Sequence, residues 1–186
     1  MRRLIILILL FSRYSLPAQT VDSSVVADYE IKEFLKDVRP LIMKGAKFIL
    51  SEKTEYNQAK EILQNISKSD TGLTNKDTEF MLGQVDKMKD IIWNSKFIGK
   101  AIFIKAERID SIFRNLKKDG GWKLFRKTYG SDFYKMSIPC FCEDKQFAFI
   151  YIEYYCGGLC GEGGFKIFKR QNNKWILFDF GISWVS

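Results

Sequence analysis

The segment of this chain with the most reactive side chains is CGGLCGEGG, residues 156–164, which holds five glycines, two cysteines and one glutamate. A phosphate-binding loop of the Walker type requires a lysine and a serine or threonine that open a helix. A dinucleotide fingerprint likewise places its glycines at the start of a helix. This segment has neither lysine nor hydroxyl, and it leads into a run with a strand pattern. The sequence therefore argues against a nucleotide-phosphate site here.

The four cysteines, Cys140, Cys142, Cys156 and Cys160, raise the questions of metal binding, redox catalysis and disulfide formation. Their spacings are not those of zinc knuckles, and thioredoxin-type chemistry needs a Cys-x-x-Cys pair at a helix N-terminus. We therefore predict no metal site, and a Cys156–Cys160 disulfide that closes a turn whose glycines need positive φ. Cys140 and Cys142 are either free or paired across the sheet, since four cysteines allow three pairings.

The absence of histidine narrows the chemistry further. It excludes Ser-His-Asp and Cys-His catalysis and histidine-ligated zinc. No complete catalytic motif takes its place, so the sequence leans towards a protein that is not an enzyme and predicts no cofactor. Carboxylates and tyrosines are the groups that remain for binding or proton transfer.

Glu153 is the strongest candidate among them, because it stands in an otherwise aromatic strand pattern. Residues two apart share one face of a strand, so Tyr151 and Tyr155 should lie beside it, and Glu162 follows in the loop. An acid in an apolar face can bind a ligand or transfer a proton, which requires a deep pocket around Glu153. The alternative, which the residues favour, is a structural ion pair between Glu153 and a lysine such as Lys166 across the hairpin.

The first residues read as a secretory signal peptide. Arg2 and Arg3 precede an unbroken apolar run, and Ala18 offers a small residue at a cleavage point. The apolar run is shorter than the roughly 20 residues that a membrane-spanning helix needs. We therefore predict a signal peptide at 1–18, a single domain at 19–186 with no stable membrane span after cleavage, and export to the periplasm or beyond.

Charge gives little support for a nucleic-acid partner. Removal of Arg2, Arg3 and Arg13 with the leader lowers the formal net charge from +8 to +5. The remaining lysines and acids are interspersed, whereas a nucleic-acid site needs a basic stripe with aromatic side chains between the charges. The densest basic group is Lys166, Lys169, Arg170 and Lys174, which strand alternation places on a solvated face.

Helical periodicity dominates the first half of the mature chain. Apolar spacing predicts helices at 24–38, 57–66 and 75–93, with a short one after a strand at 100–105 and another bearing Trp122, Phe125 and Tyr129. Thr74 is the expected N-cap of the third. The Arg39-Pro40 pair should interrupt the first, because proline disfavours helix in the residue before it.

The second half changes to a period of two. It predicts strands at 133–141, 146–155, 164–170 and 175–185, with short connections that favour antiparallel neighbours. The last strand should place Ile176, Phe178, Phe180, Ile182 and Trp184 on one face. The expected fold is α+β, with a helical N-terminal half packed on an antiparallel meander of about four to five strands.

The second half also resembles a known family. The segments WKLFRKTYG, MSIPCFCEDKQFAFIYIEYYCGGLCGEGG and NNKWILFDFGISWVS resemble a family of uncharacterised secreted bacterial proteins of the Bacteroidetes type. The curved sheet that this implies is also similar, more distantly, to nuclear-transport-factor-2-like and cystatin-like folds. The resemblance implies export and this fold, and it carries no activity or site residue.

These features together predict an exported, non-enzymatic binding or interaction protein of the periplasm or cell envelope, whose partner is an envelope protein or a small ligand. A small-ligand carrier or enzyme with a pocket around Glu153 is one alternative. An immunity or inhibitor protein is the other. A pocket beside Glu153 would favour the first alternative, and a filled sheet face would exclude it.

Overall fold

A computed structural model describes residues 26–44, 47–66, 71–114 and 118–186. The predicted signal peptide, 1–18, lies outside them. The helices are α1 Asp28–Ile42, α2 Tyr56–Ile66, α3 Asn75–Lys87, α4 Ala106–Arg114 and α5 Lys118–Thr128. The strands are β1 Ile49–Ser51, β2 Ile102–Ile104, β3 Phe133–Met136, β4 Cys140–Phe141, β5 Phe147–Gly157, β6 Cys160–Gln171 and β7 Lys174–Val185.

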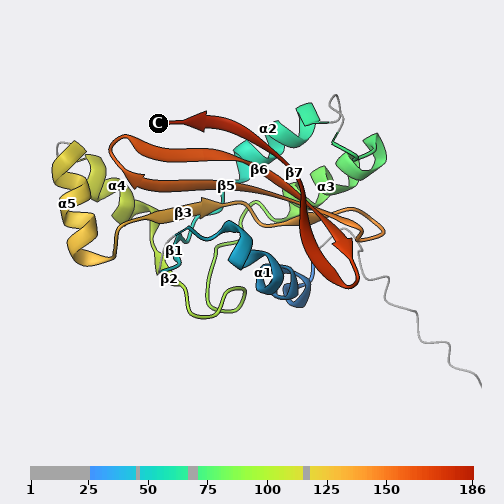
Figure 1. Ribbon diagram of the computed structural model, residues 1–186, viewed down its shortest axis with the longest axis horizontal. Coiled ribbons are helices and arrows are strands. Elements are labelled where there is room, and N and C mark those ends of the chain that lie inside the picture. The colour runs from blue at the N-terminus through green and yellow to red at the C-terminus, as the bar shows by residue number, and fades with distance from the viewer. Residues whose placement is uncertain (1–25, 45–46, 67–70, 115–117) are drawn as a thin grey trace, which may run out of the picture.

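The strands form one sheet in the order β2-β1-β3-β5-β6-β7, with β4 beside β5 (Figure 1). Strands β3 to β7 pair with one another in antiparallel fashion, which confirms the α+β fold and the C-terminal meander. The short strands β1 and β2 come from the helical half and join in parallel. The sheet is therefore mixed, because α2 and α3 lie between β1 and β2 and carry the chain back to the same end.

Helices cover both faces of β5, as its two apolar faces predicted. On the face of Ala148, α1 inserts Phe34, whose ring centroid lies 5.3 Å from that of Phe168, the partner of Ala148 across β6. On the other face, Phe133 of β3 stacks on Tyr155 of β5 at 4.9 Å. That face is covered at its β3 end by α4 and α5 (Figure 1).

Two helix boundaries differ from the sequence prediction. Helix α1 continues past Pro40 to Ile42. The proline cannot donate to the carbonyl of Lys36, but the last turn is closed by Met43 N, which donates to Arg39 O at 2.9 Å, and by the burial of Ile42. Helix α3 begins at the predicted cap Thr74 but ends at Lys87 rather than at residue 93. The main chain of Trp93 donates instead to Glu52 O at 2.8 Å, beside β1, and its ring is buried.

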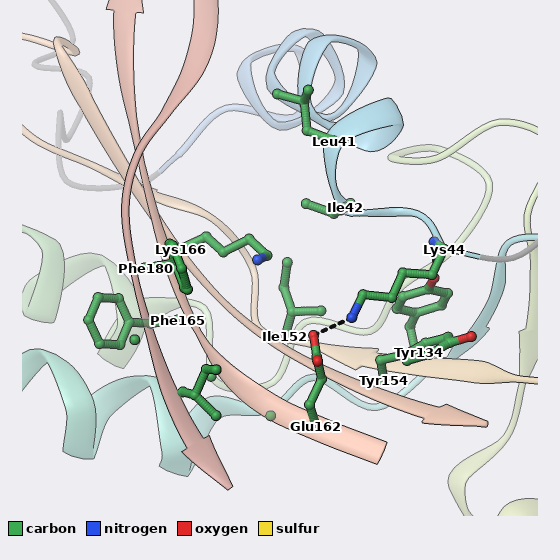
Figure 2. A pocket seen from close by; sticks show the side chains of 14 residues that line it. Leu41, Ile42, Lys44, Tyr134, Ile152, Tyr154, Glu162, Phe165, Lys166 and Phe180 are labelled. Atoms are coloured by element: carbon green, nitrogen blue, oxygen red, sulfur yellow. Dashed lines mark hydrogen bonds and ion pairs between the residues drawn. The ribbon is translucent and has the colours of Figure 1, made fainter. Parts of the chain in front are cut away.

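The face pattern predicted for the last strand is wrong. Bulges place Phe178 and Ser183 as extra residues in β7, opposite the steps Ile167/Phe168 and Gly163/Gly164 of β6. Each bulge inverts the alternation of side chains that follow it. Phe178 and Trp184 therefore lie on the face of Tyr151, whereas Phe180 and Ile182 lie on the opposite face, around the cleft shown in Figure 2.

No helix within the described part of the chain is both long and apolar enough to cross a membrane.

Candidate functional site

Strand β5 brings three of the four predicted site residues together. Tyr151, Glu153 and Tyr155 share one face, as their spacing of two requires. The Tyr151 hydroxyl donates to Glu153 Oε1 at 3.0 Å, and the Tyr155 hydroxyl donates to Glu153 Oε2 at 2.8 Å. Glu153 is 6% exposed, so this buried carboxylate has a phenol donor on each oxygen.

The predicted ion pair between Glu153 and Lys166 is wrong. Lys166 lies opposite Ile150 and projects from the other face of the sheet, whereas the neighbours of Glu153 are Lys135 on β3 and Gly163 on β6. The Lys135 ammonium lies 3.9 Å from the carboxylate of Glu55. Two glutamates and one lysine thus meet beside the tyrosines.

Burial sets the protonation of this cluster. It raises the pKa of both Tyr151 and Tyr155, with the negative charge of Glu153 adding to the effect, so both phenols stay protonated and donate. Burial also raises the pKa of Glu55, and Glu153 adds to that shift while Lys135 opposes it. The tyrosines therefore serve as hydrogen-bond donors at neutral pH and are poor general bases.

Trp184 joins this cluster from the last strand. Its indole Nε1 donates to the Tyr151 hydroxyl at 3.3 Å, and its ring lies 5.4 Å from that of Tyr155. The indole occupies the place where a side chain at position 163 would stand: a Cβ on Gly163 would lie 2.0 Å from Nε1. Gly163 is therefore a glycine because Trp184 lies over it.

A cavity of about 590 Å³ adjoins the cluster on this face. Aromatic side chains from five elements form much of its wall: Phe113, Trp122, Phe133, Tyr155 and Trp184. Lys135 and Asp110 supply the charged groups of the lining. Glu153 lies behind Tyr155 rather than in the lining, so its carboxylate orients Tyr155 directly and Trp184 through Tyr151.

The glycine-rich hairpin closes one side of this cavity. Cys156 and Cys160 form the predicted disulfide, with Cα atoms 5.1 Å apart, and Gly157 and Gly158 line the cavity. The expectation that the segment's glycines need positive φ is wrong for Gly157 and for the strand glycines at 161, 163 and 164. Close approach of neighbouring strands explains the strand glycines instead; a Cβ at position 164 would lie 2.1 Å from the carbonyl oxygen of Gly181.

The fourth predicted residue, Glu162, lies on the opposite face of the sheet. It pairs with Tyr154 across β5, and its carboxylate accepts from Lys44 Nζ at 2.6 Å, as Figure 2 shows. Both line a second cleft, of about 180 Å³, between the end of α1 and strands β5 to β7. Glu162 and Glu153 therefore belong to different sites.

The remaining cysteines, Cys140 and Cys142, are buried free thiols. Burial raises the pKa of both, that of Cys142 to about 11. Cys142 donates to Asp144 Oδ1 at 2.8 Å, which keeps its proton in place. Within the described ranges, no three side chains of the metal-binding types are grouped closely enough to hold an ion.

Sequence reasoning missed Trp184, Lys135 and Phe113 as parts of the site. The sequence predicted Trp122 as part of a helix face, but no local pattern indicated that its ring would contact Phe133 on β3. The signal available was the glycine at position 163 opposite an aromatic strand, since a glycine within a strand often marks the close approach of another group.

Comparison with protein-family models, with curated proteins and with solved structures found no match. The resemblance to a family of secreted bacterial proteins thus stays a prediction, and function is argued from the geometry.

Proposed function

We propose that this protein is an exported, non-enzymatic binding protein whose aromatic cavity takes a flat, largely apolar small molecule. The observation that carries the proposal is the cavity of about 590 Å³ walled by five aromatic side chains. Ligand sites of roughly 300–1,000 Å³ with apolar walls and few polar groups are typical of small-molecule binding. Export rests on the signal-peptide pattern of the leader.

The rings around the cavity are arranged for contact with a planar ligand. Phe133 and Tyr155 are stacked with an interplanar angle of 12°. The ring of Trp184 lies beside that of Tyr155, with an interplanar angle of 40°. Planar groups bind well against such offset or tilted rings, which expose faces and edges of opposite partial charge. Lys135 Nζ, 5.5 Å from the Tyr155 ring centroid, is placed to meet a polar substituent.

The buried polar cluster fits a binding role better than a catalytic one. Glu153 has both oxygens hydrogen-bonded to phenols and does not line the cavity. A general base must reach the proton that it removes, whereas a carboxylate behind the wall holds the wall rigid. Rigid walls favour affinity because fewer side chains have to be ordered on binding.

Fluorescence titration with 1-anilinonaphthalene-8-sulfonate tests the proposal, because the naphthalene ring of this probe is planar and its fluorescence rises when it enters an apolar cavity. We expect saturable binding with one probe per chain. The variant Gly157→Leu narrows the cavity, and a Cβ there meets no atom closer than 3.5 Å. We expect it to weaken the binding of the probe by about tenfold or more, which corresponds to a loss of about 1.4 kcal/mol of binding free energy.

Gly83→Leu is the matched control, since a side chain at that position on α3 meets nothing within 4 Å. It should leave probe affinity at the wild-type value. Equal binding by wild type and Gly157→Leu would refute the aromatic cavity as the site, and so would the absence of saturable binding.

A further inference from the structure

The second cleft, on the opposite face of the sheet, carries an excess of positive charge. Lys44, Lys166 and Glu162 all line it, and Figure 2 shows the two lysines extending into the same space from different elements. The carboxylate of Glu162 already forms an ion pair with Lys44, whose Nζ lies 2.6 Å from Oε1. Lys166 has no ion pair within the described residues, and the ring of Phe180 lies 5.5 Å from its Nζ.

Lys166 is also poorly solvated. Its side chain is half-buried, and burial lowers the pKa of its ammonium, with the charge of Lys44 acting in the same direction and that of Glu162 opposing it. A cation that has lost part of its water without gaining an anion is an unsatisfied electrostatic position. A bound anion would relieve it.

The rest of the cleft is apolar. Ile152 lies between the two lysines (Figure 2), and Leu41, Phe180 and Ile182 surround them with exposed fractions of 54%, 56% and 63%. Large apolar side chains gathered at this exposure around a pocket mark a surface that another molecule covers. The charge excess specifies the head group of that molecule, and the apolar rim specifies its body.

We propose that this cleft binds a free monocarboxylate with an unbranched apolar chain, whose head group lies between Lys166 and Lys44 and whose chain covers Ile152 and Phe180. The carboxylate would compete with Glu162 for Lys44 and would give Lys166 its missing partner. The site is separate from the aromatic cavity, so it does not depend on the function proposed above.

Calorimetric titration with decanoate below its micelle concentration tests this site. We expect one decanoate per chain, and at least about tenfold weaker binding for Lys166→Met, because a charge-assisted hydrogen bond is lost. Lys166→Arg should retain binding. Lys169→Met is the matched control on the same strand, since Lys169 pairs with Phe147 and projects from the other face.

Glu162→Gln separates ligand binding from a structural role. Removal of the competing carboxylate should tighten decanoate binding by severalfold, whereas loss of a merely structural ion pair would weaken it or leave it unchanged. In NMR titrations of the Lys166 side chain, decanoate should raise the pKa of the ammonium, since a nearby anion favours the charged form.

Three outcomes would overturn the proposal. Decanol binding as tightly as decanoate would show that the negative charge of the head group does not contribute to binding. Equal affinity in Lys166→Met and wild type would remove Lys166 from the site. Weakened decanoate binding in Gly157→Leu would place the fatty acid in the aromatic cavity, which Gly157 lines, and a failure of 1-anilinonaphthalene-8-sulfonate to bind would leave the decanoate result intact.

Discussion

At the scale of single residues, two carboxylates, Glu153 and Glu55, meet beside the tyrosines of β5. Glu153 is satisfied by two phenols, whereas Glu55 meets one lysine at the long distance of 3.9 Å and is close enough to Glu153 for their charges to interact. A raised pKa means that the folded state favours the protonated form of Glu55. Glu55 therefore contributes stability below its ordinary pKa, and that contribution is lost as the pH rises through the raised value.

Glu55→Gln should remove this dependence. We expect the variant to gain stability relative to wild type as the pH rises from about 4 to about 7, because the wild-type carboxylate must ionise where it is buried and beside Glu153. Urea unfolding at several pH values measures the difference. Glu61→Gln, at an exposed position on α2, is the control and should show no such trend; a parallel trend in both variants would contradict the assignment.

At the scale of elements, β7 decides the shape of both sites. Its two bulges send Trp184 to the aromatic cavity and Phe180 and Ile182 to the second cleft. The strand also lies at one edge of the sheet, and Asp179 Oδ1 accepts from the main-chain amide of Phe180 at 2.8 Å. Bulges and charges on an edge strand oppose the addition of further strands.

The position of the Trp184 indole over Gly163 can be tested by adding one methyl group. Gly163→Ala should displace the indole, break its hydrogen bond to Tyr151 and cost about 1–3 kcal/mol of unfolding free energy as overpacking. Tryptophan fluorescence and near-ultraviolet circular dichroism should change with it. Gly83→Ala, at an open helical position, should instead stabilise the protein by up to about 1 kcal/mol. Equal stability of Gly163→Ala and wild type would show that Trp184 has another position available.

At the scale of the whole molecule, one sheet separates the two sites. Strand β5 contributes Tyr155 to the aromatic cavity from one face and Ile152 to the charged cleft from the other. Each face has its own helical cover, α1 on one side and α4 with α5 at the β3 end of the other (Figure 1). The linings of the two sites therefore have no residue in common.

Export and cysteine chemistry are tested together on protein isolated from its native cell envelope. We expect the intact mass of a chain that begins near Gln19, one Cys156–Cys160 disulfide in non-reducing peptide maps, and no zinc. Cys140 and Cys142 should react with a thiol reagent only after unfolding, because both are buried with raised pKa values. A mass that retains the leader would contradict export, and four thiols with stoichiometric zinc would contradict the disulfide.

The amino-acid sequence by itself determined what depends on local periodicity. The spacing of two placed Tyr151, Glu153 and Tyr155 on one face of a strand. The cap at Thr74 and the short ring between Cys156 and Cys160 are likewise properties of neighbouring residues. Helical and strand periods are repeated every few residues, so they can be read without knowing what the element packs against.

Tertiary structure alone decided the partners across strands. The register of β6 against β5 set Gly163, and not Lys166, beside Glu153. The two bulges in β7 inverted an alternation that the sequence pattern extended unbroken. Whether the aromatic residues filled a core or walled a cavity depended on how α4 and α5 met the sheet, which is a contact between segments far apart in the chain. Register and packing are set by the whole sheet, and no local spacing encodes them.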